Sequence, residues 1–187
     1  MLEIRWHSRA GQGAVTGAKG LGSVIAKTGK QVQAFAFYGS AKRGASMTAY
    51  NRIDDSVILN HEKYMRPDYV LIIDPGLAFT DNITANEKDT TKYIITTHLE
   101  KDKLIPLIPA LKGKEDRVFV VDCIGIATET IGKPIPNTPV LGALMKVDGM
   151  FDLEYFQNAM KKVLGKLPQN IIDANMIAIE RAYNEVR

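Results

Sequence analysis

The sequence predicts an α/β fold with three layers, in which helices cover both faces of an open sheet that is mostly parallel or mixed. Two continuous apolar runs, residues 69–73 and 118–121, are each followed by an aspartate, and such runs are typical of parallel strands buried on both faces. Segments with helical periodicity lie between and after the strands. With 187 residues, 45% of them hydrophobic, the chain can bury one sizeable core, so we predict a single domain over residues 1–187.

The first third of the chain predicts a strand, a glycine turn, a helix and two further strands. Residues 2–6 are the first strand. From Ala14 the apolar residues recur with helical spacing, so a helix is expected to run to about Thr28. Residues 31–38 predict a second strand, and residues 46–53 alternate as a half-buried strand does, which is why the sheet is expected to include mixed pairing.

The rest of the chain predicts another strand over residues 92–97 and three helices. Thr138 followed by Pro139 is typical of a helix N-cap and first helical position, so a helix begins there. Two stripes with helical spacing predict two C-terminal helices, and we interpret both as core: Leu153, Phe156, Met160 and Val163, then Ile172, Met176, Ile179 and Tyr183.

Composition excludes several classes of protein. No apolar run of about 18 residues occurs, and Arg5 and Arg9 interrupt the layout of a signal peptide, so a cytoplasmic protein without membrane association is expected. The single Cys123, which we interpret as an inert core thiol, rules out an internal disulfide and an iron–sulfur cluster ligated by this chain alone. The three histidines lie far apart in sequence, so no metal site is expected.

Positive charge is concentrated near the N-terminus. Residues 1–53 hold eight Lys or Arg and one acidic residue, a net charge of +7, which leaves −4 for the rest of a chain whose net charge is +3. Such a field favours anions or acidic surfaces. Nucleic acid is not the expected partner, because the chain has no basic run and no aromatic RNA-binding signature.

A glycine-rich turn follows the first predicted strand. Arg9 precedes Gly11, Gln12 and Gly13, and with Gly17 they give G-x-G-x-x-x-G, one residue longer than the dinucleotide fingerprint. Such a turn at a helix N-terminus suits a phosphate, because free N–H groups and the helix dipole favour negative charge.

Two nucleotide-binding motifs are nevertheless excluded or disfavoured. The strand over residues 31–38 has no acidic residue at its end for a ribose hydroxyl, which argues against an NAD site, and no P-loop pattern occurs. Gly17 and Gly20 are interpreted as allowing the first helix to pack closely on the sheet, since glycine inside a helix costs about 1 kcal/mol relative to alanine.

A second basic segment follows the strand that ends at Tyr38. Lys42 and Arg43 lie between Gly39 and Gly44, where they could reach a phosphate of an acyl-CoA or an acidic partner. A solvated loop carrying two positive charges is the alternative interpretation.

The carboxyl ends of the buried strands carry Asp74 and Asp122. Ligands of open α/β sheets bind beyond these ends, but we prefer the interpretation that each aspartate caps the next helix or turn. His7 has no serine or cysteine at the spacing of a nucleophilic triad. No catalytic residue and no complete catalytic apparatus are therefore predicted on this chain.

Short motifs spread along the chain point to a known family. They are Arg5-Trp6-His7, Arg9-Ala10-Gly11-Gln12-Gly13-Ala14, Gly29-Lys30, Val32-Gln33-Ala34-Phe35, Tyr38-Gly39, Asn51-Arg52-Ile53, Pro67-Asp68, Ile135-Pro136-Asn137-Thr138-Pro139 and Leu141-Gly142-Ala143. In this order and at these distances they resemble the gamma subunit of pyruvate:ferredoxin oxidoreductases, also called pyruvate synthases, over nearly the whole chain.

The resemblance implies one chain of a multisubunit enzyme that converts a 2-oxoacid such as pyruvate, coenzyme A and oxidised ferredoxin to an acyl-CoA, carbon dioxide and reduced ferredoxin. It implies alpha, beta and delta subunits as partners, with ferredoxin reached through the complex; contacts between two copies of this chain stay open. In that family thiamine diphosphate, magnesium and the [4Fe–4S] clusters belong to other subunits. The residues expected to contact coenzyme A or a partner are Arg9, Gly11, Gln12, Gly13, Tyr38, Lys42 and Arg43.

One segment departs from the family pattern. Many relatives carry an acidic residue after the Tyr-Gly pair, where this chain has Ser40-Ala41-Lys42, so a contact made by that acid is not expected here. The gamma chains of pyruvate enzymes and of branched-chain 2-oxoacid enzymes look similar. The alternative function is therefore an assembly module of a 2-oxoisovalerate enzyme that touches no ligand.

Overall fold

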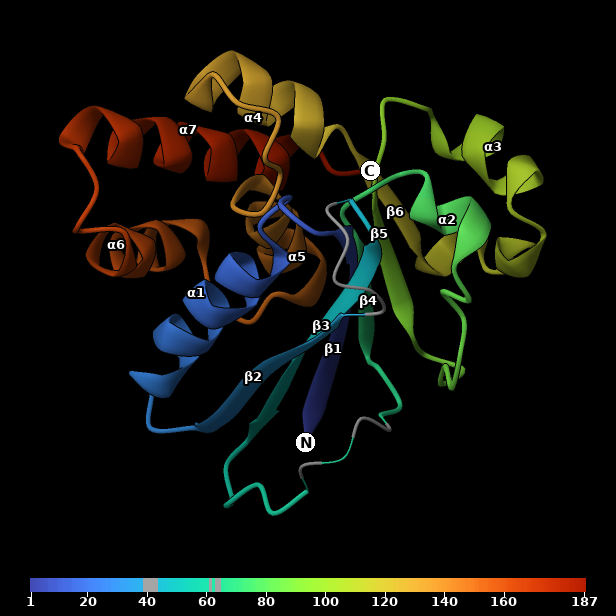
Figure 1. Cartoon of the computed structure of the whole chain (residues 1–187), viewed down its shortest axis with the longest axis horizontal. Coiled ribbons are helices and arrows are strands. Elements are labelled where there is room, and N and C mark those ends of the chain that lie inside the picture. The colour runs from blue at the N-terminus through green and yellow to red at the C-terminus, as the bar shows by residue number, and fades with distance from the viewer. Residues whose placement is uncertain (39–43, 61, 63–64) are drawn as a thin grey trace.

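The computed structural model describes residues 1–38, 44–60, 62 and 65–187 and contains a six-stranded sheet in the order β2-β3-β1-β4-β5-β6 (Figure 1). The β2–β3 and β3–β1 pairs are antiparallel, whereas β1, β4, β5 and β6 run parallel. The predicted α/β fold with a mixed sheet is confirmed. The strands are β1 (Leu2–Arg9), β2 (Gln31–Tyr38), β3 (Ser46–Asp54), β4 (Tyr69–Ile72), β5 (Lys92–Thr96) and β6 (Val118–Val121).

One face of the sheet carries the larger core. Five helices pack there: α1 (Ala14–Ala26), α4 (Cys123–Ile131), α5 (Pro139–Asp148), α6 (Leu153–Val163) and α7 (Gln169–Glu185). Trp6 is fully buried at the centre, and its Nε1 donates to Asn51 Oδ1 at 2.9 Å. Asn51 Nδ2 donates in turn to the Ala18 carbonyl at 2.8 Å, so hydrogen bonds join β1, β3 and α1 inside this core.

The opposite face is only half covered. The short helices α2 (Leu77–Thr80) and α3 (Lys101–Leu104) and the 3₁₀ turns after α3 form a second core with β4, β5 and β6. Among the described residues, this second core contains none from β1, β2 or β3. Helices therefore lie on both faces, as predicted, but beside this core Arg5, His7 and Tyr50 line a pocket instead.

Several predicted details need correction or extension. β1 continues to Arg9, three residues beyond the expected strand, and brings the start of the glycine turn into the sheet. Thr138 precedes α5 as predicted, but its side chain makes no capping hydrogen bond. Asp122 does cap a helix: its Oδ1 accepts the Gly125 N–H at 2.9 Å at the start of α4.

The glycines that allow close packing are only partly those predicted. A Cβ at Gly17 would lie 3.1 Å from the Trp6 ring, which confirms that prediction, whereas at Gly20 it would meet only Met160 Cε at 3.7 Å, an ordinary contact. The tightest position is Gly142, where a Cβ would lie 2.1 Å from the Ile179 carbonyl oxygen in α7. Gly142 therefore sets how closely α5 and α7 approach.

Candidate functional site

The glycine turn lies at the carboxyl end of β1 and leads directly into α1. Gly11 and Gly13 have φ of +102° and +86°, a region that favours glycine over residues with a side chain. The N-cap residue of α1, Gly13, has no side chain that could cap the helix, and the first turn carries no acidic residue. The first-turn N–H groups thus face the end of the sheet with the positive end of the helix dipole behind them.

Gln12 holds this turn in place. Its Oε1 accepts the backbone N–H of Arg9 at 2.8 Å and the Ser8 hydroxyl at 3.2 Å, while its Nε2 donates to Asp74 Oδ2 at 2.7 Å. Both ends of the Gln12 amide are therefore engaged within the chain. The sequence predicts Gln12 as a ligand or partner contact, and in the structure its side chain positions the turn.

Arg9 and Asp74 form an ion pair beside the turn. Arg9 Nε lies 3.2 Å from Asp74 Oδ2, and Arg9 Nη1 donates to the Gly44 carbonyl at 3.2 Å. Asp74 Oδ1 also accepts the Gly76 N–H at 2.9 Å, so its predicted role in capping a turn is confirmed. The Arg9 side chain is 40% exposed and keeps one face toward solvent, although Asp74 offsets part of its charge.

Asn137 packs against the turn from the segment before α5. A Cβ at Gly13 would lie 2.8 Å from Asn137 Nδ2, so glycine is needed there for space as well as for its backbone conformation. The sequence alone did not single out Asn137 or Ser8 as part of this site. The signal was present, because the motifs that carry the family resemblance include the Ile-Pro-Asn-Thr-Pro stretch beside the glycine turn.

The other predicted site residues either lie farther from the glycine turn or fall outside the described residues. Tyr38 ends β2 with 61% of its surface exposed and pairs with Met47 of β3, which pairs with Ser8 of β1. Two strand spacings put Tyr38 about 10 Å from Ser8 along this edge. Lys42 and Arg43 lie outside the described residues. The structure thus brings Arg9, Gly11, Gln12 and Gly13 into one turn, with Tyr38 at the same end of the sheet.

His7, Asp81 and Ser46 form a second polar cluster next to the turn. His7 Nδ1 lies 2.9 Å from Asp81 Oδ2, and the Ser46 hydroxyl donates to the same oxygen at 3.0 Å. Burial lowers the pKa of His7, and the hydrogen bond from His7 lowers the pKa of Asp81, so a neutral imidazole faces a carboxylate. Ser46 contacts the aspartate and not the imidazole, so the cluster is not a nucleophilic triad.

Cys123 and the acidic side chains offer no sign of a metal centre. Cys123 is fully buried at the start of α4, and burial raises the pKa of its thiol, which confirms the prediction of an inert core residue. Within the described ranges, no three His, Cys, Asp or Glu side chains gather closely enough to hold a metal ion. In the same part of the chain, no helix combines the length and apolarity needed to cross a lipid bilayer.

Comparison with known proteins identifies the family. The pattern of the pyruvate ferredoxin/flavodoxin oxidoreductase family matches residues 3–185. The pyruvate/ketoisovalerate oxidoreductases common subunit gamma of Thermococcus kodakarensis is 42% identical over 186 residues, 99% of this chain and 97% of that protein. The pyruvate synthase subunit PorC of Thermotoga maritima is 39% identical over 187 residues, 100% of this chain and 95% of that protein.

Solved structures agree with the sequence matches. The crystal structure of the Thermotoga maritima pyruvate oxidoreductase subunit PORC aligns with a TM-score of 0.84 and 36% identity, covering 100% of this chain and 97% of that one. A 2-oxoglutarate:ferredoxin oxidoreductase from Magnetococcus marinus shares the fold, with a TM-score of 0.72 and 17% identity over 98% of this chain and 30% of that one. The family inferred from the motifs is confirmed: the chain belongs to the pyruvate ferredoxin/flavodoxin oxidoreductase family and matches its gamma subunits along its full length.

Proposed function

We propose that this chain is the gamma subunit of a multisubunit pyruvate:ferredoxin oxidoreductase, in which alpha, beta and delta subunits complete the enzyme and ferredoxin takes up the electrons. The observation that carries the proposal is the full-length match to gamma subunits at 42% and 39% identity. The complex would join coenzyme A to the acyl group left after decarboxylation of the 2-oxoacid.

The cofactors of such an enzyme would reside on other subunits. A [4Fe–4S] cluster is held by four cysteines, whereas this chain has one, Cys123, which is fully buried. Thiamine diphosphate and magnesium would likewise be held elsewhere in the complex. This chain would contribute binding surface and positioning, and no redox group of its own.

We further propose that the glycine turn and the basic loop after β2 form the surface by which this chain meets coenzyme A at the subunit interface. The uncapped N-terminus of α1 and the solvent-facing side of Arg9 favour an anion there. Gly11, Gly13 and Tyr38 would shape this surface, Gln12 would hold it rigid, and Lys42 and Arg43 would supply the positive charge that Asp74 does not offset.

The test replaces the basic pair in the assembled enzyme. Lys42→Ala with Arg43→Ala should raise the apparent KM for coenzyme A about tenfold or more, because two charge-assisted contacts to phosphate are lost. Lys161→Ala with Lys162→Ala is the matched control, since both lysines are exposed on α6 and the same charge is removed. Unchanged coenzyme A kinetics in an intact complex would refute the coenzyme A contact and leave the subunit assignment standing.

A second candidate function is a pure assembly module that touches no small molecule, as in an enzyme for 2-oxoisovalerate. It is favoured by one observation: the side chains of Arg9 and Gln12 are already engaged with Asp74. Calorimetry with coenzyme A on the isolated chain and on the complex bears on this choice. Heat of binding with the isolated chain would exclude the pure assembly module, whereas absence of binding heat in both samples would refute the coenzyme A contact.

The choice of 2-oxoacid would be made outside this chain. A relative from Thermococcus kodakarensis is named as a gamma subunit common to pyruvate and ketoisovalerate oxidoreductases. We therefore expect exchange of this subunit between two such enzymes to leave the preference for each 2-oxoacid unchanged.

A further inference from the structure

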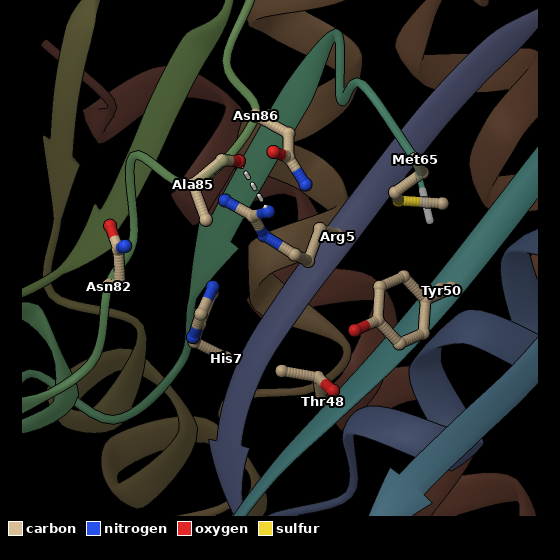
Figure 2. Close-up of a pocket in the computed structure, with 8 residues that line it drawn as sticks. All are labelled: Arg5, His7, Thr48, Tyr50, Met65, Asn82, Ala85 and Asn86. Atoms are coloured by element: carbon tan, nitrogen blue, oxygen red, sulfur yellow. Dashed lines mark hydrogen bonds between the residues drawn. The ribbon is translucent and has the colours of Figure 1, made fainter. Parts of the chain in front are cut away.

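A pocket of about 390 Å³ lies on the half of the sheet that α2 and α3 leave uncovered (Figure 2). Its walls include Arg5 and His7 from β1, Tyr50 from β3, Met65 before β4, and Asn82 and Asn86 from the turn after α2. No residue of the glycine turn lines it, so this pocket is separate from the surface proposed above for coenzyme A.

Arg5 brings a buried positive charge to this pocket. Its side chain donates from Nη1 to the Ala85 carbonyl at 2.7 Å and from Nη2 to the Ile83 carbonyl at 2.6 Å. Arg5 is 5% exposed, its Nε has no hydrogen-bond partner, and among the described residues no carboxylate forms an ion pair with it. A buried guanidinium that is bonded only to neutral carbonyls keeps its full charge, which is costly without a counter-ion.

His7 adds a hydrogen-bond acceptor next to this charge. Its Nδ1 is engaged with Asp81, which fixes the proton on that side of the ring, and its Nε2 is buried and has no hydrogen-bond partner among the described residues. Figure 2 shows the far ring nitrogen directed toward the space between Arg5 and Asn82. The nearby carboxylates are engaged elsewhere, Asp81 with His7 and Ser46, and Glu87 with Lys114 and Tyr93.

We propose that this pocket binds a small hydroxycarboxylate. The carboxylate accepts the Arg5 Nε–H and neutralises the guanidinium, while the hydroxyl on the adjacent carbon donates to His7 Nε2. One ligand group thereby satisfies each of the two nitrogens that the chain leaves unpaired. Both nitrogens are buried, so the ligand would have to enter by displacing the exposed side chains of Asn82 and Asn86, which also line the pocket.

The structural alternative is that Arg5 only clamps the turn at Ile83 and Ala85 onto the sheet. An Arg5 that only holds this turn needs no ligand. A direct binding measurement therefore separates a ligand pocket, which binds the probe, from a purely structural Arg5, which does not. The probes are glycolate, acetate and ethylene glycol, added to the full-length chain at constant ionic strength. NMR resonances of the Arg5 Nε–H and the His7 ring report on the pocket itself.

Glycolate should shift both resonances saturably, with a dissociation constant of about a millimolar. Acetate, which lacks the hydroxyl, should bind about tenfold more weakly, because one hydrogen bond is lost. Ethylene glycol, which lacks the charge, should give no saturable shift. No saturable change with glycolate at either resonance would overturn the proposal and leave the clamp.

Two variants test the assigned contacts. His7→Asn keeps a donor to Asp81 but is too short to place an acceptor at the position of Nε2, so it should erase the difference between glycolate and acetate. Asn86→Asp places a carboxylate at the exposed mouth and should abolish glycolate binding, whereas Asn158→Asp on the exposed face of α6 and Arg66→Gln beside Met65 should not. Wild-type glycolate binding by Asn86→Asp would contradict the assignment of the carboxylate to Arg5.

The same titration in the assembled enzyme tests whether the pocket serves a free ligand there. Glycolate binding that persists in the complex supports a free hydroxycarboxylate. Loss of binding only in the complex would mean that a neighbouring subunit covers or fills the pocket, and would overturn the assignment to a free ligand. Neither result depends on the coenzyme A surface, so failure of that proposal would not affect this one.

Discussion

At the scale of single residues, Gln12 shows how a motif residue can serve the site indirectly. Its amide satisfies the Arg9 backbone, the Ser8 hydroxyl and Asp74 at once. The sequence placed Gln12 between two glycines and therefore suggested contact with a ligand. In the structure these hydrogen bonds fix the turn, and Asp74 reaches Gln12 from the segment that follows β4.

Gln12→Glu tests this role. The new carboxylate would face Asp74 Oδ2 in place of an amide that now donates over 2.7 Å, so we expect a loss of about 1–3 kcal/mol in the free energy of unfolding at pH 7. The loss should shrink near pH 5, where the two carboxylates can share a proton. Urea unfolding at both pH values measures it. Gln169→Glu is the control, because that amide also contacts an aspartate, Asp173, but in an exposed position.

If Gln12→Glu and Gln169→Glu lower the free energy of unfolding by the same amount, the effect at Gln12 does not come from its burial or its position in the turn. A loss in Gln12→Glu that is the same at pH 5 and pH 7 would rule out repulsion between carboxylates as the cause.

His7 predicts a pH dependence of stability. Burial holds its pKa below the ordinary value, so between that lowered pKa and about 6.5 the unfolded chain binds more protons than the folded one. The stability that comes from keeping His7 neutral in the folded state is therefore fully present above about pH 6.5, and it is lost as the pH falls toward the pKa of the folded state. From this one proton, the free energy of unfolding changes by at most about 1.4 kcal/mol per pH unit.

Urea midpoints from pH 5 to 8 measure this slope. His7→Asn should flatten it, because the substitute keeps a donor to Asp81 but does not titrate. His98→Asn, on an exposed residue, should keep the wild-type slope. An unchanged slope in His7→Asn would place the titrating group elsewhere.

At the scale of elements, hydrophobic pattern located most strands and long helices. The β2 strand matches the expected residues 31–38, and the α6 and α7 helices carry the two predicted stripes. The sequence does not predict the short helices α2 and α3, because each spans one turn and therefore shows no helical periodicity. For α4 it predicts only the cap, Asp122, and not the extent of the helix.

Two glycines in helix interiors should respond in opposite directions to the same substitution. Gly142→Ala should destabilise the chain by about 3 kcal/mol, because a Cβ there would lie 2.1 Å from the Ile179 carbonyl oxygen and α5 must move away from α7. Gly20→Ala should stabilise it by about 0.5–1 kcal/mol, because alanine favours the helix and meets only Met160 Cε at 3.7 Å.

Thermal or urea unfolding of both variants gives the comparison, and each serves as the control for the other. Equal effects would mean that intrinsic helix preference outweighs the packing between α5 and α7.

At the scale of the whole molecule, folding redistributes the charge of the first 53 residues. Arg52 is fully buried and its Nε lies 3.0 Å from Glu3 Oε1, Arg5 is buried in its pocket, and Arg9 pairs with Asp74. The net charge of +7 in this part of the sequence therefore overstates the field that a partner meets. Lys19 on α1 and Lys27, directly after α1, are exposed and supply part of the positive charge that remains.

Salt should weaken assembly through these exposed charges. Raising the salt from about 50 to 300 mM shortens the Debye length, so association of this chain with its partner subunits should slow down. Lys42→Ala with Arg43→Ala should show a smaller salt dependence than Lys161→Ala with Lys162→Ala. Association kinetics of the full-length chain with the remaining subunits measure this, and equal salt dependence in both double variants would exclude the basic loop from steering.

The sequence by itself determined the family, the α/β class, the helical stripes and the turn that joins β1 to α1, because periodicity and short motifs are local properties of a chain. Only the tertiary structure decided what the motif residues do. Arg9 and Gln12 meet Asp74, and Gly13 meets Asn137. Arg5 meets Ile83 and Ala85, and His7 meets Asp81. All of these contacts join segments far apart in sequence. Which buried polar atom finds a partner depends on distance in space, and the order of residues alone does not carry that distance.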